Sequence, residues 1–153
     1  MKKVIPIVLL LILLAPSAHA FSSPHRLLEK LDAMFEWVKE EMEIPEAKRP
    51  PVFISSRQIF FDICKRTTDG TENYECEKVI GLYFVKSRTI HISEHSYQSI
   101  VDSTIIHEMV HFMQHLKYGL SFFVHDENEK FMEDQADALG RKYVRQKYGI
   151  VTR

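Results

Sequence analysis

The stretch STIIHEMVHFMQH, residues 103–115, places His107, Glu108 and His111 inside an apolar segment. Apolar residues recur around it at helical spacing, so we expect a helix from about residue 96 to 116. His107 and His111 are four positions apart and would lie on one face of that helix, one turn above the other. Their imidazoles can therefore bind one metal ion. Glu108 is displaced by about 100° around the axis and would instead reach a water molecule at that ion.

A second interpretation of the same stretch needs no metal. His107 and His111 could be ordinary polar residues of a partly buried helix, with Glu108 a surface charge. The His-Glu-x-x-His pattern is short enough to arise by chance. Its place at the centre of an independently predicted apolar helix favours the metal site, because burying two imidazoles and a carboxylate is costly unless something binds them.

A catalytic zinc ion usually has three protein ligands and one open position, so the pattern requires a third ligand. His115, on the same helix, would lie a full turn too far along the axis. A second helix with the sequence EKFMEDQADALGRKYV, residues 129–144, offers three carboxylates instead: Glu133, Asp134 and Asp137.

Glu133 and Asp137 are four positions apart and share one face of this second helix. Glu133 could bind the ion while Asp137 accepts a hydrogen bond from a ligand imidazole and fixes its tautomer. Ala136 and Ala138 are small, and we expect them to let the two helices approach closely.

The sequence HEMVH, followed 22 residues after its second histidine by EDQADALG, resembles the gluzincin metallopeptidases. In that family a "glutamate helix" follows the His-Glu-x-x-His helix. The resemblance covers residues 79–148, and the order of elements is similar to that of the minimal, single-subdomain gluzincins. It implies that Glu133 is the third zinc ligand and Asp137 the hydrogen-bond partner of a ligand histidine. It also implies that a hairpin at residues 79–93 forms the sheet edge that pairs with extended substrate.

Two properties of that family have no assigned counterpart in this sequence. Larger members stabilise the transition state with a His or Tyr of a second subdomain; Tyr143, His115 and His125 are candidates here, and spacing selects none of them. Some minimal members are latent, with a segment covering the cleft. The first helix, or the segment LSFFVHDE at residues 120–127, could cover it here.

Residues 1–20 have the pattern of a secretory signal peptide. Two lysines precede an apolar run at residues 4–14, and AHA at residues 18–20 gives a cleavage site. The run is too short to span a membrane comfortably, and a retained N-terminal anchor is the weaker alternative. We expect cleavage, export to the periplasm or beyond the cell, and one domain formed by residues 21–153 with no membrane span.

The chain has two cysteines, Cys64 and Cys76. In an exported protein two cysteines are expected to form a disulfide. Closing a loop of about a dozen residues would stabilise the fold by about 3 kcal/mol. Neither cysteine belongs to a Cys-x-x-Cys pair, which argues against a cysteine-based metal site.

In the first half of the chain we expect a helix, strands and a hairpin. Ser23 is a suitable N-cap for a helix that begins at Pro24 and runs to about residue 42. The β-branched and aromatic residues of the segment 52–64 predict one or two strands. A hairpin at residues 79–93 should turn near residues 86–88.

In the second half we expect two helices. Gly119 is a plausible C′ residue for the helix that carries the histidines. Asp126 and Glu129 resemble a capping box at the start of a last helix, which should run to about Tyr148 and stop at Gly149. The order helix, strands, helix, helix predicts an α+β fold with a small antiparallel or mixed sheet.

Charge excludes some classes of partner. Without the two lysines of the leader, 18 basic residues face 21 acidic ones, and no basic cluster is present, which argues against nucleic acid or anionic lipid. The sequence predicts a secreted hydrolase that binds one Zn²⁺ per chain, acts on a peptide or protein substrate and uses Glu108 as general base. The alternative is a non-catalytic or latent zinc-binding module that docks peptides or an envelope protein, in which Glu108 would have no necessary role. Oligomeric state and cleavage specificity stay open.

Overall fold

The computed structural model describes residues 24–67, 76–123 and 125–149. The elements in chain order are α1 (Pro24–Met42), β1 (Val52–Ser55), α2 (Arg57–Thr67), β2 (Gly81–Phe84), β3 (Thr89–Ser93), α3 (Gln98–Phe123) and α4 (Asp126–Tyr148). The α+β class is confirmed, with an N-terminal helix, a small mixed sheet, a helix that carries both histidines and a helix that carries Glu133. The expected leader, residues 1–20, and the expected N-cap Ser23 lie outside the described residues.

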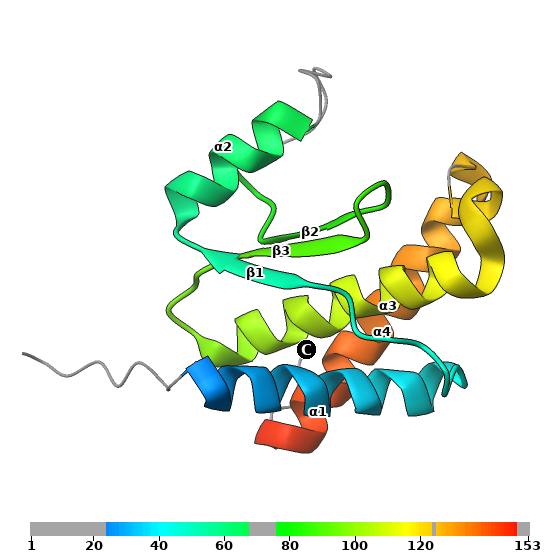
Figure 1. Cartoon of the computed structure of the whole chain (residues 1–153), viewed down its shortest axis with the longest axis horizontal. Helices are drawn as coiled ribbons and strands as arrows, with labels where there is room; N and C mark the ends of the chain where they lie inside the picture. Colours follow the sequence, from blue (N-terminus) through cyan, green and yellow to red (C-terminus); the bar gives the residue numbers. More distant parts are fainter. Residues whose placement is uncertain (1–23, 68–75, 124, 150–153) are drawn as a thin grey trace, which may run out of the picture.

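The sheet has the strand order β1-β3-β2. β1 runs parallel to β3, with Val52 opposite Ile90, and β2 runs antiparallel to β3, with Leu82 opposite His91. The expected hairpin is therefore present as β2 and β3. Because β3 is the central strand, β2 lies at an edge of the sheet (Figure 1).

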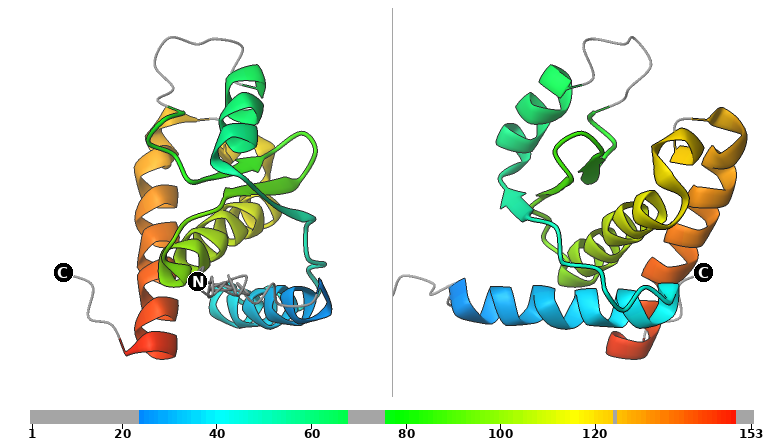
Figure 2. Two further views of the ribbon diagram at one scale, coloured as in Figure 1. Left: turned by 90° about the vertical axis from the view of Figure 1, so that its left-hand side faces the viewer. Right: turned by 45° about the vertical axis from the view of Figure 1, so that its right-hand side comes forward.

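The helices cover both faces of the sheet. α2 lies on one side, and α3 and α1 lie on the other, with α4 running beside α3 (Figures 1 and 2). Ile90 and Ile92 of β3 are fully buried in the main core, together with apolar residues of α1 and α3. On the opposite face, Phe60 and Cys64 of α2 form a smaller core with Leu82. The sheet thus separates two clusters, and α3 packs against the face on which the larger one lies.

The expectation of strands throughout residues 52–64 was wrong for its second half, which is the helix α2. Phe60 and Cys64 are four positions apart and both are fully buried, so a helix presents them together to the sheet. Gln58 donates a hydrogen bond to Asp62 on the other side of this helix. Aromatic content predicts a strand only where the side chains pack on a pleated surface. Here a helix buries Phe60 and Cys64 together on one face.

α2 is tied to the segment that leads into β2. The expected disulfide between Cys64 and Cys76 is present, with Cα atoms 5.9 Å apart, and it is a bond typical of oxidising compartments. The Arg57 guanidinium donates hydrogen bonds to the backbone carbonyls of Glu77 and Val79. The middle of the intervening loop, residues 68–75, lies outside the described residues.

α3 continues past the end expected from sequence. Gly119 has φ +79° and ψ 170°, which breaks the helical path, but a further turn follows it to Phe123. A positive φ of this kind is one that glycine adopts at no steric cost. Gly119 therefore ends the first helical stretch, as expected, and a short second stretch follows it across the kink.

The capping box expected at Asp126 and Glu129 was wrong. The N-cap of α4 is His125, whose side chain makes no capping hydrogen bond, and Asp126 already belongs to the first helical turn. Acidic residues in that turn are favourable because of the helix dipole. The expected stop is correct: Gly149 is left-handed, and its N–H donates to the carbonyl of Arg145 at 3.0 Å.

A buried carboxylate joins three helices. Asp102 of α3 is fully buried and accepts hydrogen bonds from Lys30 of α1, from Gln98 at 2.9 Å, and from Lys147 and Tyr148 of α4 at 3.0 and 2.6 Å. Burial alone would raise the pKa of Asp102, but these four donors outweigh it and lower that pKa. Sequence patterns gave no indication of this network.

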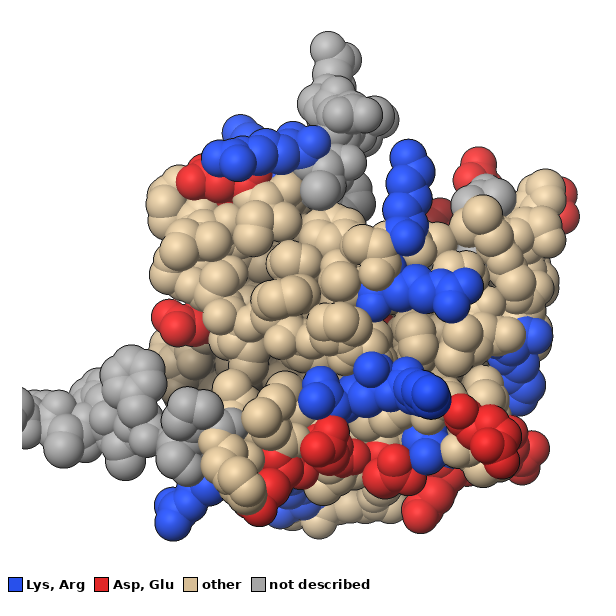
Figure 3. All heavy atoms as spheres, viewed as in Figure 1, with Lys and Arg blue, Asp and Glu red and all other residues tan. Residues whose placement is uncertain are grey.

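The solvent face of α1 carries mixed charge. In Figure 3, acidic side chains gathered over α1 lie next to lysine and arginine side chains. Arg49 pairs with Asp32 at 2.6 Å and Lys142 with Glu41 at 2.6 Å. Within the described part of the chain, no helix combines the length and the apolarity needed to cross a membrane.

Candidate metal centre

α3 brings His107 and His111 together as the sequence predicted. Both Nε2 atoms face the same space and lie 2.9 Å apart. The His111 side chain is 9% exposed and the His107 side chain 21%. Apolar neighbours such as Ile106 and Val110 occupy the other faces of the helix and are fully buried, so the histidine face is the one turned toward α4.

α4 adds Glu133 to this pair. Its Oε1 lies 3.1 Å from Nε2 of His111, and its Oε2 lies 3.3 Å from Nε2 of His107. Potential ligand atoms of His107, His111 and Glu133 all lie within 4.8 Å of one another. Two nitrogens and one carboxylate from two helices are a donor set that zinc accepts in catalytic sites.

The close approach of the two helices depends on small residues, although not on both of those expected. Ala136 is fully buried between the helices, whereas Ala138 is exposed. Gly140 takes the second role: a Cβ atom there would lie 3.0 Å from Oγ of Ser103 and 3.1 Å from its carbonyl oxygen. The expectation for Ala138 was therefore wrong, and Gly140, two residues further along α4, is the second small residue at the contact.

Each histidine has a partner on its other ring nitrogen. Nδ1 of His107 lies 3.1 Å from Oδ1 of Asp137, the residue expected to orient an imidazole. Nδ1 of His111 lies 2.9 Å from Oε1 of Gln114. An acceptor on Nδ1 places the imidazole proton there and leaves the lone pair of Nε2 directed at the common space.

Electrostatics link the three groups. Burial disfavours the protonated form of His107, but the carboxylates of Glu133, Glu108 and Asp137 outweigh burial and raise its pKa. Without a metal ion, a proton on Nε2 of either histidine is donated to Glu133, and these hydrogen bonds hold the pKa of Glu133 far below its usual value. A bound cation would take the place of that proton. The cluster is thus arranged for an anionic carboxylate with a cation beside it.

Glu108 lies beside this cluster without belonging to it. It is 7% exposed, and its carboxylate accepts a hydrogen bond from the backbone N–H of Tyr83 in β2. Burial raises the pKa of Glu108, although His111 and His107 nearby oppose the rise. Gly81, also in β2, allows this approach, because a Cβ atom there would lie 2.7 Å from Oε1 of Glu108.

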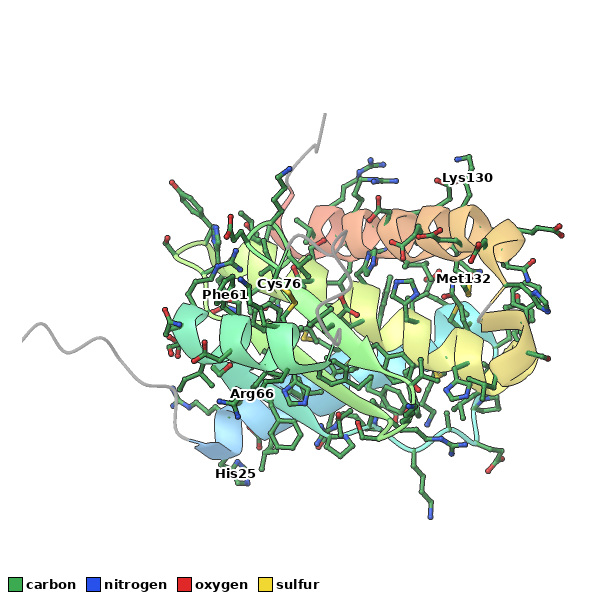
Figure 4. All side chains as sticks on the ribbon, turned by 90° about the horizontal axis from the view of Figure 1, so that it is seen from above. His25, Phe61, Arg66, Cys76, Lys130 and Met132 are labelled. Carbon is green, nitrogen blue, oxygen red and sulfur yellow. A yellow bond between two sulfur atoms is a disulfide. The ribbon has the colours of Figure 1, made fainter. Side chains whose placement is uncertain are left out.

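The cluster opens into a cleft of about 670 Å³. One wall is the segment 79–83, which includes the edge strand β2, and the other walls are α3 and α4. Ser93 donates its N–H to the carbonyl of Ile80, so alternation along the strand directs the peptide groups of Gly81 and Tyr83 away from β3. The edge of the sheet therefore faces the cleft. Met132 also lines the cleft, and Figure 4 shows it on the side of α4 that faces α3.

The three residues considered as transition-state stabilisers lie in different places relative to the cleft. His125 is exposed and lines the cleft. His115 lies near the end of α3, where its Nδ1 is 2.7 Å from the hydroxyl of Tyr83. Tyr143 packs edge-on against Trp37, with ring centroids 5.2 Å apart. Only His125 of the three lines the cleft, which is also lined by Tyr83, a residue that the sequence did not suggest.

The two segments considered as possible covers of the cleft differ in their position relative to it. α1 packs into the main core, and none of its residues lines the cleft. His125 and Asp126, from the segment 120–127, do line it.

Comparison with protein-family models, with curated proteins and with solved structures yields no match to this chain. The function of the chain is therefore inferred from the geometry of its residues.

Proposed function

We propose that this chain is an exported zinc-dependent metallopeptidase of the gluzincin type. The observation that carries the proposal is the convergence of three acceptor atoms: Nε2 of His107, Nε2 of His111 and a carboxylate oxygen of Glu133. With both Nδ1 atoms directed at acceptors, these lone pairs repel one another unless a cation lies between them. Two nitrogens and one carboxylate fit zinc, one ion per chain, with a position left open for a water molecule.

The chemistry that a bound zinc ion supplies is Lewis acidity toward a water molecule and toward the carbonyl of the scissile bond. Glu108 lies one residue from His107 and has its carboxylate at the cleft, where it accepts the proton of the attacking water. It then delivers that proton to the nitrogen of the leaving amine. The N–H of Tyr83 holds the carboxylate in place during both transfers.

The proposed substrate is a peptide in extended conformation. The outward N–H and C=O groups of Gly81 and the C=O of Tyr83 lie along the cleft wall, where a substrate backbone could add to the sheet as a further strand, while the N–H of Tyr83 stays with Glu108. The disulfide between Cys64 and Cys76 supports export, because such bonds persist in oxidising compartments. With the expected leader removed, residues 21–153 would form the mature enzyme.

Metal stoichiometry tests the ligand set. We expect one zinc per wild-type chain and loss or strong weakening of binding in Glu133→Ala. Asp134→Asn is the matched control, because Asp134 is the next residue along α4 but pairs with Lys130 at 2.7 Å on the exposed side of the helix. Equal zinc binding by all three proteins would move the third ligand away from Glu133.

Hydrolysis of a peptide library tests the catalytic role. Glu108→Gln should retain zinc, because the amide oxygen can still accept from Tyr83, and should lower turnover by about 10²–10⁴-fold or more. Glu129→Gln, which lines the same cleft but does not belong to the cluster of His107, His111 and Glu133, should retain activity. Zinc binding without hydrolysis by the wild type would instead indicate the non-catalytic or latent zinc-binding module.

A further inference from the structure

Gln114 is a fully buried amide between the two helices of the candidate metal centre. Its Oε1 lies 2.9 Å from Nδ1 of His111 on its own helix, α3. Its Nε2 donates to the backbone carbonyl of Met132 at 2.9 Å and to Oε1 of Gln135 at 3.0 Å, both on α4. One side chain therefore contacts a proposed ligand on one helix and the backbone next to another proposed ligand, Glu133, on the second.

The contact with Met132 fixes which way the amide points. A backbone carbonyl can only accept hydrogen bonds, so the NH₂ group of Gln114 must face α4. The oxygen of Gln114 must then face His111, and because that oxygen also only accepts, Nδ1 of His111 must donate. Proton placement on His111 is thus determined by a main-chain atom of the neighbouring helix.

The same bond locates α4. Met132 directly precedes Glu133, so a hydrogen bond to the Met132 carbonyl holds the α4 backbone within one peptide unit of the carboxylate. Met132 lies on the face of α4 turned toward α3, and Lys130 points away from it (Figure 4). An amide as deeply buried as Gln114 is costly unless all its polar atoms are bonded, so the side chain has little freedom to leave this arrangement.

We infer that Gln114 is a positioning residue that couples His111 to Glu133. It keeps the proton of His111 on Nδ1, so that the lone pair of Nε2 points into the space between the histidines and Glu133. It also holds Glu133 on the opposite side of that space. The inference rests on the proposed function in so far as it takes the shared space to be a metal site. Sequence spacing did not assign this role, because the partners of Gln114 lie on a different helix.

The test compares Gln114→Met with Gln135→Met, using zinc alone as the probe. Gln114→Met keeps the length of the side chain and removes all three contacts, and we expect zinc affinity in a chelator competition to fall by about 10–100-fold. Gln135→Met removes only one partner of the amide and should leave zinc affinity near the wild-type value. Wild-type affinity in Gln114→Met would overturn the inference.

Nitrogen chemical shifts of the His111 ring in metal-free protein at alkaline pH separate positioning from a merely structural role. Wild type should show the Nδ1–H tautomer, and Gln114→Met should lose that preference. Gln114→Glu should keep the Nδ1–H tautomer, because a carboxylate only accepts, yet bind zinc more weakly because its link to Met132 is lost. If Gln114→Met does not fold, the wild-type tautomer and Gln114→Glu decide. An Nε2–H tautomer in the wild type would overturn the inference.

These readouts distinguish failure of the inference from failure of the proposed function. A wild type that binds zinc but hydrolyses no peptide would defeat the peptidase proposal and leave the Gln114 affinity test intact. A wild type that binds no zinc would defeat the metal site, and with it the coupling of His111 to Glu133 through a metal.

Discussion

At the scale of single residues, the tightest constraint on the candidate site lies between β2 and α3. A Cβ atom at Gly81 would lie 2.5 Å from Cγ2 of Thr104 and 2.7 Å from Oε1 of Glu108. Real Cβ atoms do not approach other atoms so closely. The glycine is required because of the space it leaves, and that space lets the Tyr83 N–H reach the Glu108 carboxylate.

We predict that Gly81→Ala lowers peptide hydrolysis by about 10²-fold, because a displacement near 1 Å at a reacting group has an effect of this size. Zinc stoichiometry should stay at the wild-type value, since the atoms nearest to the new methyl group belong to Thr104 and Glu108 and not to a proposed ligand. Measurement of turnover and bound zinc on the same preparation separates the two effects.

Thr104→Ser provides a control in the Gly81→Ala background. It removes the nearest obstacle, Cγ2, and keeps the hydroxyl that donates to the carbonyl of Ile100 at 2.9 Å. We expect the double variant to recover thermal stability but not activity, because the contact with Glu108 persists. Recovery of both would show that Glu108 had not been displaced.

The site could be predicted from sequence only where its geometry is local. The spacing of His107 and His111 along one helix specifies their shared face, so both were predictable from the sequence. Periodicity placed Glu133 and Asp137 on one face of a second helix, and the resemblance to the gluzincins implied Glu133 as the ligand. Gly81 and Gln114 could not be assigned their contacts, because those contacts depend on how β2 and α4 pack against α3.

At the scale of elements, α2 illustrates where composition misleads. Residues 57–64 contain isoleucine and phenylalanine at a density typical of strands, yet they form a helix. The decisive feature is the pairing of Phe60 with Cys64 at helical spacing over the sheet. The hairpin of β2 and β3, in contrast, was predicted with its turn near residues 86–88, and the pairing of Phe84 with Thr89 places the turn there.

The disulfide attaches α2 to the approach of β2, and its removal should destabilise the fold. We predict that the double variant Cys64→Ser, Cys76→Ser lowers the free energy of unfolding by about 3 kcal/mol, from the entropy of the opened loop. Urea denaturation with and without reductant measures this. Reduced wild type should match the variant, and an unchanged midpoint in both would show that the bond contributes nothing.

At the scale of the whole molecule, Asp102 connects α1, α3 and α4. Hydrogen bonds to charged groups contribute about 1.5–3 kcal/mol each, so we predict that Asp102→Asn lowers the free energy of unfolding by at least about 2 kcal/mol at pH 7. Asp32→Asn is the control. Its ion pair with Arg49 is at the surface, where such pairs contribute about 0–1 kcal/mol.

The contribution of Asp102 should also depend on pH. Its pKa is lowered in the folded state relative to about 3.9 in the unfolded chain, so the stabilisation is complete above about pH 4. It is lost as the pH falls through the folded-state pKa. The difference in unfolding free energy between wild type and Asp102→Asn should therefore be constant from pH 5 to pH 7 and shrink in more acidic buffer.

Metal binding should stabilise the whole chain. Zinc that binds only the folded protein adds about 4 kcal/mol at a free concentration 1,000 times the dissociation constant. We therefore expect thermal unfolding to shift upward with zinc and to return to the metal-free value with a chelator. Glu133→Ala should show no such shift, whereas an equal shift in the variant would place the ion elsewhere.

The hairpin formed by α3 and α4 has a consequence for the order in which the chain folds. All three proposed ligands lie between residues 107 and 133, whereas β1 must reach β3 across α2, a loop and β2 before Val52 can pair with Ile90. Contacts between distant parts of a chain form more slowly than local ones. We therefore expect zinc to bind the hairpin of α3 and α4 early in folding, before β1 pairs with β3. The sheet would then form next to a metal centre that is already complete.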